Sequence, residues 1–166
     1  MKLTDKIHLL KIDFEITLSP GRKLPRFVNV LMIIDDNITL IDTGVKGTEK
    51  IIFDYIKKQG RHHSDIQKII LSHSHPDHIG SAAKIKELTG CKVFTHEHEK
   101  EWIENIDKQY QERPVPGFFS LVDKPVVVDE LIQDNQRMRT GNGLSLRFIK
   151  ASGHSKGCLN ILFEED

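Results

Sequence analysis

The sequence predicts an α/β fold, and three observations support this prediction. Short apolar runs of strand length alternate with segments whose apolar residues recur at helical spacing. Glycine, proline and small polar residues, which are typical of turns, separate these segments. The 166 residues are 38% hydrophobic and 29% charged, as in ordinary globular proteins. We therefore expect one domain with a substantial core over residues 1–166.

The N-terminal part predicts a meander of strands. Residues 7–18 alternate loosely between apolar and polar side chains. Residues 28–34 and 38–41 indicate two further strands, joined by the polar turn Asp35-Asp36-Asn37. We expect these strands to pair with one another.

A helix and a buried strand follow the meander. Over residues 48–59 the apolar residues recur at helical spacing, with Thr48 as the expected N-cap and Gly60 just after the helix. Residues 66–71 form a short apolar run bounded by polar residues, which is typical of a strand buried on both faces. This strand leads directly into a cluster of histidines.

The pattern continues through the middle of the chain. Residues 79–88 predict a helix closed by Thr89-Gly90, and residues 92–95 predict a strand. Residues 97–111 can form another helix. The alternation of strands and helices indicates an α/β layer.

The last third differs in character. The segment Arg113-Pro114-Val115-Pro116-Gly117 breaks the pattern and marks a plausible boundary between two halves. Residues 126–128, 144–149 and 159–163 predict strands, separated by polar segments. No helix is predicted after them.

The histidine cluster is the feature that indicates a chemistry. In the segment His73-Ser74-His75-Pro76-Asp77-His78, four potential metal ligands lie within six residues: His73, His75, Asp77 and His78. Imidazole and carboxylate groups together form a zinc-type ligand set. A solvated histidine-rich turn is the alternative, but a dense cluster held between a strand and a helix favours a metal site.

Three motifs resemble the metallo-β-lactamase superfamily. The histidine cluster resembles the signature metal loop of the family. The segment Thr39-Leu40-Ile41-Asp42-Thr43-Gly44 is similar to the strand that ends in Asp-Thr-Gly, and Ser152-Gly153-His154-Ser155-Lys156-Gly157 is similar to the Gly-His segment. The resemblance covers residues 39–157 in the family's order. It implies the αββα sandwich of two sheets with helices on both outer faces.

The resemblance also implies roles for these residues. His73, His75 and His154 would form one zinc site, and Asp77 and His78 would contribute to a second. Three neutral imidazoles leave the fourth position of a tetrahedral zinc open, as a catalytic site requires. Asp42 would orient the metal loop without binding the metal itself. Asp77 would be catalytic, because it would hold the metal-bound hydroxide that attacks the substrate.

The sequence departs from the family near its end. Only twelve residues follow His154, too few for the bridging Asp and the final His that complete family members carry. Glu164, Glu165 and Asp166 are expected to be solvated charges. We therefore expect the first half of the sandwich to be complete and the second half to lack its C-terminal portion. A partly uncovered second sheet would favour self-association.

The expected function is metal-dependent hydrolysis of a thioester, ester or lactone-type bond in a small-molecule substrate, similar to hydroxyacylglutathione hydrolases (glyoxalase II). One or two Zn²⁺ ions are the expected cofactor, with iron or manganese as further options. A truncated or non-catalytic metal-binding chain is the alternative from another class.

Two other activities of the same family are less favoured. A phosphodiesterase or RNA-processing nuclease would need a basic surface, but Lys and Arg together number 24 and so do Asp and Glu. We therefore expect no nucleic-acid partner. The flavodiiron reductases carry Glu as the second ligand of the loop, whereas position 75 here is His.

The remaining features have structural interpretations. Cys91 and Cys158 are expected to be buried, reduced thiols, and the N-terminus shows neither a signal peptide nor a membrane span, so we expect a cytoplasmic protein.

His62-His63 is expected at the surface, and the acids in His96-Glu97-His98-Glu99 suit the first turn of a helix. Core packing is expected for Trp102, Phe118 and Phe119, with a substrate groove as the alternative.

Overall fold

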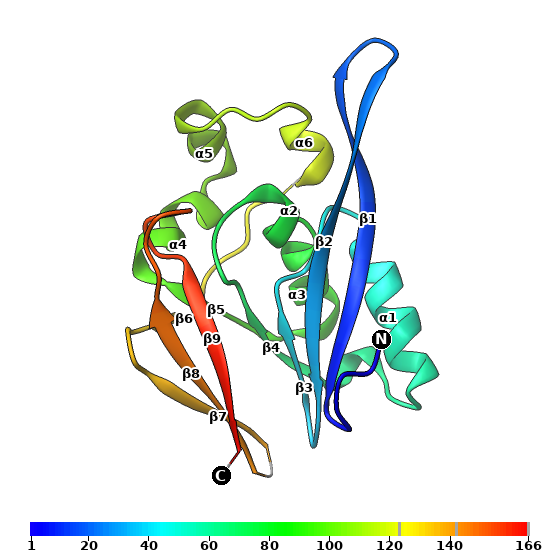
Figure 1. The fold of residues 1–166 in the computed structure, drawn as a ribbon, viewed down its shortest axis with the longest axis vertical. Helices are drawn as coiled ribbons and strands as arrows, with labels where there is room; N and C mark the ends of the chain where they lie inside the picture. Colours follow the sequence, from blue (N-terminus) through cyan, green and yellow to red (C-terminus); the bar gives the residue numbers. More distant parts are fainter. Residues whose placement is uncertain (123, 142, 166) are drawn as a thin grey trace.

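Two β-sheets form the frame of the protein in the computed structural model, which describes residues 1–122, 124–141 and 143–165. The first sheet has six strands in the order β1-β2-β3-β4-β5-β6, and the second has three in the order β7-β8-β9 (Figure 1). The strands are β1 (Ile7–Ser19), β2 (Arg22–Ile34), β3 (Ile38–Ile41), β4 (Ile66–Ile70), β5 (Lys92–His96), β6 (Glu130–Ile132), β7 (Arg137–Gly141), β8 (Leu144–Lys150) and β9 (Leu159–Glu165).

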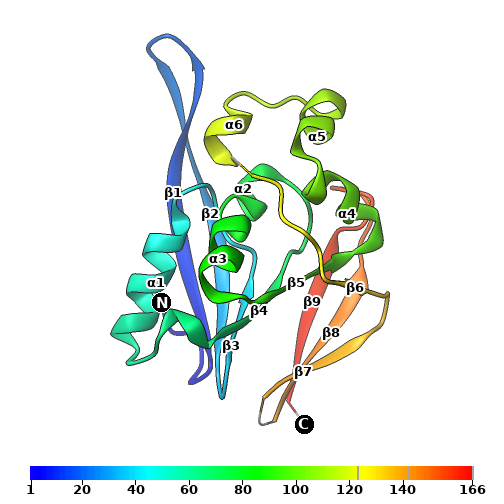
Figure 2. The same ribbon diagram turned by 180° about the vertical axis from the view of Figure 1, so that it is seen from behind.

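The helices fall between β3 and β6. They are α1 (Thr48–Lys58), the 3-10 turn η1 (His63–Asp65), α2 (Pro76–Ile79), α3 (Ala82–Thr89), α4 (Glu97–Glu104), α5 (Ile106–Glu112) and α6 (Phe118–Leu121). Both views of the ribbon place α1 and α3 on the same face of the six-stranded sheet (Figure 2). Within the described part of the chain, no helix is long and apolar enough to cross a membrane.

The direction of the strands determines where the loops gather. Strands β1, β2 and β3 are antiparallel, whereas β3, β4, β5 and β6 run parallel to one another. The carboxyl ends of β3, β4 and β5 therefore lie at the same edge of the sheet. Ligands of α/β proteins bind at this edge, because the loops that follow the strands meet there.

The first sheet is buried on both faces. Because side chains alternate along a strand, Leu40 and Ile69 face the helices while Ile41 and Ile70 face the second sheet. On the helical side the core includes Met32, Ile52 and Ile56, all fully buried. On the other side Ile41 and Ile70 pack with Leu144, Leu146, Phe148 and Leu159. The described fold therefore has one helical layer and two sheets of the expected sandwich.

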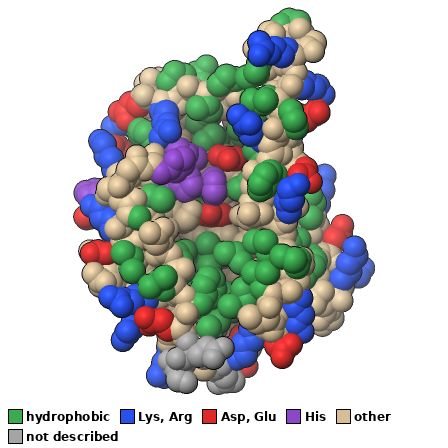
Figure 3. All heavy atoms as spheres, viewed as in Figure 1, with side chains coloured by type: hydrophobic (Ala, Val, Ile, Leu, Met, Phe, Trp, Pro, Cys, Tyr) green, Lys and Arg blue, Asp and Glu red, His purple; other side chains and the backbone are tan. Residues whose placement is uncertain are grey.

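The second sheet is covered unevenly. Strand β8 buries Leu144, Leu146 and Phe148, whereas Leu162 of β9 is 43% exposed. Hydrophobic side chains gather in the hollow between the two sheets, below the histidines (Figure 3). In the described residues every helix precedes β7, and no helix follows a strand of the second sheet.

One predicted helix is divided in the structure, and another begins later than expected. The helix expected over 97–111 ends at Glu104, because Asn105 leaves the helical conformation and its side chain accepts a hydrogen bond from the Lys108 N–H as the N-cap of α5. The helix expected over 79–88 is α3, which begins at Ala82 and ends, as predicted, at Gly90 in the left-handed conformation; the short helix α2 precedes it.

The strand predicted over 126–128 is wrong. The N–H of Val126 donates to the Ile103 carbonyl, and the N–H of Val128 donates to the Glu104 carboxylate, so this segment is bonded to α4 instead of to a strand. The edge strand β6 lies at Glu130–Ile132 instead. The polar segment after it contains β7, which the sequence did not predict.

One expected helix cap is also wrong. The N-cap of α1 is Gly47 with φ of 89°, and Thr48 is the first helical residue. Gly60 was predicted correctly, since it follows the C-cap Gln59 with a positive φ and its N–H donates to the Lys57 carbonyl.

Candidate metal centre

Three histidines converge at the carboxyl edge of the parallel strands. His73 and His75 lie in the loop between β4 and α2, and His154 lies in the connection between β8 and β9. One ring nitrogen of each lies within 4.8 Å of those of the other two. Within the ranges that the structure describes, this is the group whose geometry suits a metal ion.

The first two histidines present lone pairs to this cluster. The Nε2 atoms of His73 and His75 are buried and have no hydrogen-bond partner. Burial, with the neighbouring histidine and arginine charges, lowers the pKa of each of these two side chains to about 3. Both imidazoles are therefore neutral near pH 7, which is the form that binds metals. A buried nitrogen without a partner is costly unless a ligand completes it, so the donor set fits a divalent ion.

A chain of hydrogen bonds determines which nitrogen of His73 is free. The Ser72 hydroxyl donates to Oδ2 of Asp42 at 2.7 Å, and the same hydroxyl oxygen lies 2.9 Å from Nδ1 of His73. Because the hydroxyl proton is used on Asp42, Nδ1 of His73 carries the donated proton and Nε2 keeps its lone pair. These hydrogen bonds thus orient His73 so that Nε2 is available for coordination.

Asp42 supports the loop from the end of the neighbouring strand. Its carboxylate accepts from the Ser72 N–H at 2.8 Å and from Nδ1 of His78 at 2.8 Å. The residue has a φ of 61°, a conformation that Asp adopts more readily than most residues. The backbone strain is offset by these bonds, which aim the carboxylate at the metal loop.

Asp77 and His78 lie beside the three-histidine cluster and are not part of it. The rings of His73 and His78 are 4.1 Å apart, and Nε2 of His78 lies 3.8 Å from Oδ2 of Asp77. Burial alone would lower the pKa of His78, but its hydrogen bond to Asp42 and the charges of Asp42 and Asp77 raise the pKa above its usual value. Their assignment to a second metal stays a prediction.

His154 is brought to the cluster by contacts between the two sheets. The N–H of Leu159, at the start of β9, donates to the Ser72 carbonyl at 2.9 Å. The carbonyl of His154 accepts from a guanidinium nitrogen of Arg113 at 3.2 Å. The connection before β9 therefore passes directly over the metal loop, with His154 exposed on the open side.

Sequence reasoning did not identify Glu99 as part of this site. Its carboxylate is buried and accepts hydrogen bonds from Ser74 in the metal loop and from Gly157 beyond His154. The sequence feature that could have predicted its burial is its position four residues before Ile103, because this spacing places both residues on the buried face of α4. An acid in a first turn also suits the helix dipole, so the sequence alone gave no reason to prefer a role at the site.

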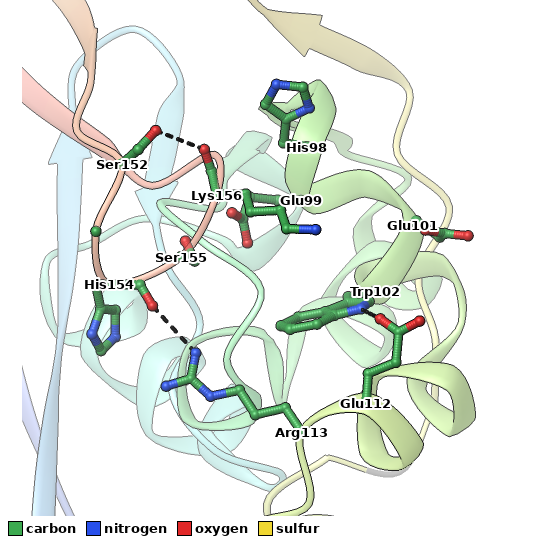
Figure 4. A pocket seen from close by; sticks show the side chains of 11 residues that line it. His98, Glu99, Glu101, Trp102, Glu112, Arg113, Ser152, His154, Ser155 and Lys156 are labelled. Atoms are coloured by element: carbon green, nitrogen blue, oxygen red, sulfur yellow. Dashed lines mark hydrogen bonds between the residues drawn. The ribbon is translucent and has the colours of Figure 1, made fainter.

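Two cavities open beside the histidines. One of about 380 Å³ is lined by Trp102, Arg113 and His154 among others (Figure 4). The second, of about 200 Å³, is lined by His75, Asp77, Arg113 and His154 among others. Trp102 therefore lines a cavity, while Phe118 is in the core as expected and Phe119 is exposed.

The other histidines and the cysteines lie outside the cluster. His96 is buried, and its Nδ1 accepts from the His98 N–H at the start of α4. The side chain of His62 caps the 3-10 turn η1. Both cysteines are free thiols, and Cys91 is buried as expected, whereas Cys158 is only half-buried.

The comparison with protein families decides the identity of the fold. The family model of the metallo-β-lactamase superfamily matches residues 24–165. The chain belongs to the metallo-β-lactamase superfamily. This match contains the metal loop, Asp42 and His154, so the family assignment and the histidine cluster agree.

Relatives of the superfamily include both proteins and solved structures. The chain is 27% identical over 82% of its length to the "Probable metallo-hydrolase MJ0888" of Methanocaldococcus jannaschii, covering 62% of that protein. It matches the crystal structure of the metallo-β-lactamase GOB-18 from Elizabethkingia meningoseptica with a TM-score of 0.72 and 27% identity, covering 84% of this chain and 50% of that one.

Similarity to glyoxalase II is restricted to a short segment. A hydroxyacylglutathione hydrolase of Hyphomonas neptunium is 46% identical over 44 residues, which is 26% of this chain and 17% of that protein. The chain thus spans about three-fifths of the metallo-hydrolase and half of the β-lactamase chain.

Proposed function

We propose that the chain carries the metal-binding part of a zinc-dependent hydrolase that cleaves a thioester, ester or lactone-type bond in a small molecule. The convergence of His73, His75 and His154 carries this proposal, because two of their Nε2 atoms are buried without partners. Membership of a superfamily with relatives named as metallo-hydrolases supports the reaction class.

The residues of the site have distinct roles in this proposal. His73, His75 and His154 would hold the ion. The bound ion would activate a water molecule and polarise the carbonyl oxygen of the substrate. Asp77 lines the smaller cavity together with His75 and His154, where its carboxylate can accept a hydrogen bond from that water. Asp42 keeps His73 in the tautomer that leaves Nε2 free.

The cavities indicate the chemistry of the substrate. Ile16, Val115 and Leu121 give the smaller cavity an apolar wall, which suits an acyl group. Arg113 lines both cavities, and its charge contributes to lowering the pKa of His73 and His75. A guanidinium beside a divalent cation is repelled unless an anion lies between or beside them. We therefore propose a substrate with an apolar acyl part and an anionic group that Arg113 binds.

The test combines metal content with turnover. The purified chain should retain zinc and hydrolyse S-lactoylglutathione or a simple anionic thioester or lactone. The double variant His73→Ala/His75→Ala should lose both the zinc and the activity. The matched control is His98→Ala, because His98 lines the larger cavity but lies outside the histidine cluster.

A metal-binding chain without turnover is the second candidate. It is favoured by the observation that Asp77 and His78 lie beside the cluster without joining it. Zinc binding at one equivalent with no hydrolysis of any of these substrates would support this candidate. Unchanged zinc content in the double variant would contradict both.

A further inference from the structure

Glu99 is an unusual buried acid. Its side chain is 1% exposed on α4, and within the described residues the partners of its carboxylate are Ser74 and Gly157, neither of which carries a positive charge. A buried carboxylate without a cation is costly unless hydrogen bonds replace the lost water. The partners of Glu99 are therefore informative about why an acid occupies this position.

Three hydrogen bonds replace the water around this carboxylate. Its Oε2 accepts from the N–H of Ser74 at 2.9 Å and from the Ser74 hydroxyl at 2.6 Å. Its Oε1 accepts from the N–H of Gly157 at 2.6 Å. Hydrogen bonds to an ionised acceptor are about twice as strong as neutral ones. The carboxylate is thus satisfied entirely by two loops.

These two loops are the ones that carry the histidines. Ser74 lies between His73 and His75, and Gly157 follows His154 by three residues. Figure 4 shows Glu99 and the His154 loop at the same cavity. One side chain therefore joins the segment that carries two of the histidines to the segment that carries the third.

The surroundings of both partners are close-packed. A Cβ added at Gly157 would lie 2.8 Å from Nδ1 of His96 and 3.1 Å from Cγ of Glu99, so the loop approaches this closely only with glycine. On the other side, the buried amide of Gln109 donates to the Ser74 carbonyl at 2.6 Å. Ser74 is held from both sides, which limits movement of the metal loop.

The arrangement mirrors the one at Asp42. Asp42 accepts from the N–H and hydroxyl of Ser72, as Glu99 does from those of Ser74. His73 thus lies between two serines, each bound by a buried carboxylate.

We propose that Glu99 is a positioning residue for the metal centre, which holds the His73–His75 loop and the His154 loop at the separation that coordination requires. The inference rests on the metal site of the proposed function and deepens it. Mutation of a residue that holds metal ligands in place by hydrogen bonds typically weakens metal affinity by about 10- to 100-fold.

The primary test is the zinc affinity of Glu99→Gln, measured by competition with a chromophoric chelator. The amide has the same shape, but its NH₂ group cannot accept hydrogen bonds, so one of the two loops loses its acceptor. We expect zinc affinity to fall about 10- to 100-fold. The matched control is Glu104→Gln on the same helix, because Glu104 accepts from the Val128 N–H, away from the histidines. Equal affinities in wild type and Glu99→Gln would overturn the proposal.

A double-variant cycle tests whether Glu99 acts through the histidines. In a His154→Ala background, Glu99→Gln should weaken zinc binding much less than in the wild type, because the loop that it fixes no longer supplies a ligand. The absorption spectrum of the Co²⁺-substituted protein should change in Glu99→Gln and remain unchanged in Glu104→Gln. Fully additive effects on affinity, or an unchanged cobalt spectrum, would show a structural role only and overturn the proposal.

A readout without metal tests the contact itself. The Gly157 amide should be protected from hydrogen exchange in the metal-free wild type and lose protection in Glu99→Gln. Ser74→Ala, which removes one of the three hydrogen bonds, serves as a milder variant if Glu99→Gln folds poorly, and should weaken zinc binding by a smaller factor. Unchanged protection of Gly157 in Glu99→Gln would contradict the proposal. If the wild type hydrolysed none of the substrates but Glu99→Gln lost zinc affinity as expected, the proposed function would be refuted and this inference would stand.

Discussion

The carboxylate of Asp42 accepts both donors of Ser72, the N–H at 2.8 Å and the hydroxyl at 2.7 Å. The two residues follow neighbouring parallel strands, β3 and β4, so the bonds join two loops at one edge of the sheet. The hydroxyl in turn contacts Nδ1 of His73. An acid that lies outside the histidine cluster therefore determines the orientation of a histidine within it.

The substitution Asp42→Asn tests this relationship. Asn tolerates the positive φ of this position, so the backbone should be retained while the charge and one of the two acceptor oxygens are lost. We expect the free energy of unfolding to fall by about 1–3 kcal/mol, because buried donors lose their acceptor, and zinc affinity to fall about 10- to 100-fold. Urea unfolding and chelator competition measure the two effects.

A comparison with Asp42→Ala shows how much of the stability comes from the backbone conformation and the hydrogen bonds of residue 42 and how much from its charge. Alanine is strained at this φ and accepts no hydrogen bond, so its loss of stability should exceed that of asparagine. If both variants matched the wild type in zinc affinity, the role of Asp42 in orienting His73 would be refuted.

The stability of the metal-free protein should depend on pH through His73. The pKa of His73 is about 3 in the fold and the ordinary value is 6.5, so the unfolded state binds the proton more readily between these values. The free energy of unfolding should therefore decrease as the pH falls from 6.5 towards 3. For this one group the slope is at most about 1.4 kcal/mol per pH unit.

The measurement compares wild type with His73→Gln by urea unfolding from pH 7 to 4 in the presence of a chelator. The difference between the two curves reports the titration of His73 together with its effect on His75, whose pKa the neighbouring His73 lowers. We expect the wild type to lose more stability than the variant on acidification. Parallel curves would contradict the low pKa of His73.

Arg113 should distinguish anionic from neutral substrates. A charge-assisted hydrogen bond is worth about 1.5–3 kcal/mol, which corresponds to roughly a 10- to 100-fold change. In Arg113→Met we therefore expect kcat/KM for an anionic thioester to fall by that factor relative to a neutral thioester of the same size, while a loss common to both substrates reports the missing hydrogen bond to the His154 carbonyl. Arg137→Met is the control, because Arg137 pairs with Glu164 on the second sheet. Equal losses for both substrates would exclude the proposed anion contact.

The second sheet should promote self-association. In the described residues β8 is the one strand that pairs with β9, and Leu162 on β9 is exposed. An open strand edge with exposed apolar side chains favours pairing with another copy. Light scattering should show an apparent mass that rises with concentration and falls in Leu162→Lys.

Phe27→Lys is the matched control for this experiment, because Phe27 is an exposed apolar residue on β2 of the first sheet. It should leave the association unchanged. A monomer at all concentrations, with a cooperative melting transition, would count against association through the second sheet.

Much of the local structure could be predicted because its signals are local. The run 66–71 and the histidines after it lie within one short segment, and the apolar spacing over 48–59 identified α1. The prediction failed where distant groups compete for the backbone. The segment 126–128 is apolar, like a strand, but its N–H groups are bonded to Ile103 and Glu104 of α4. No pattern within the segment records that partner.

The ligand types and their order were determined by the sequence alone, because a metal loop requires particular side chains at a particular spacing. Which of them meet was decided by the tertiary structure. His154 reaches His73 and His75 because β9 bonds to Ser72 and because Glu99 accepts from Ser74 and Gly157. Glu99 itself lies 58 residues from Gly157 along the chain. A contact of that range depends on how the sheets and helices pack, so only the folded protein reveals it.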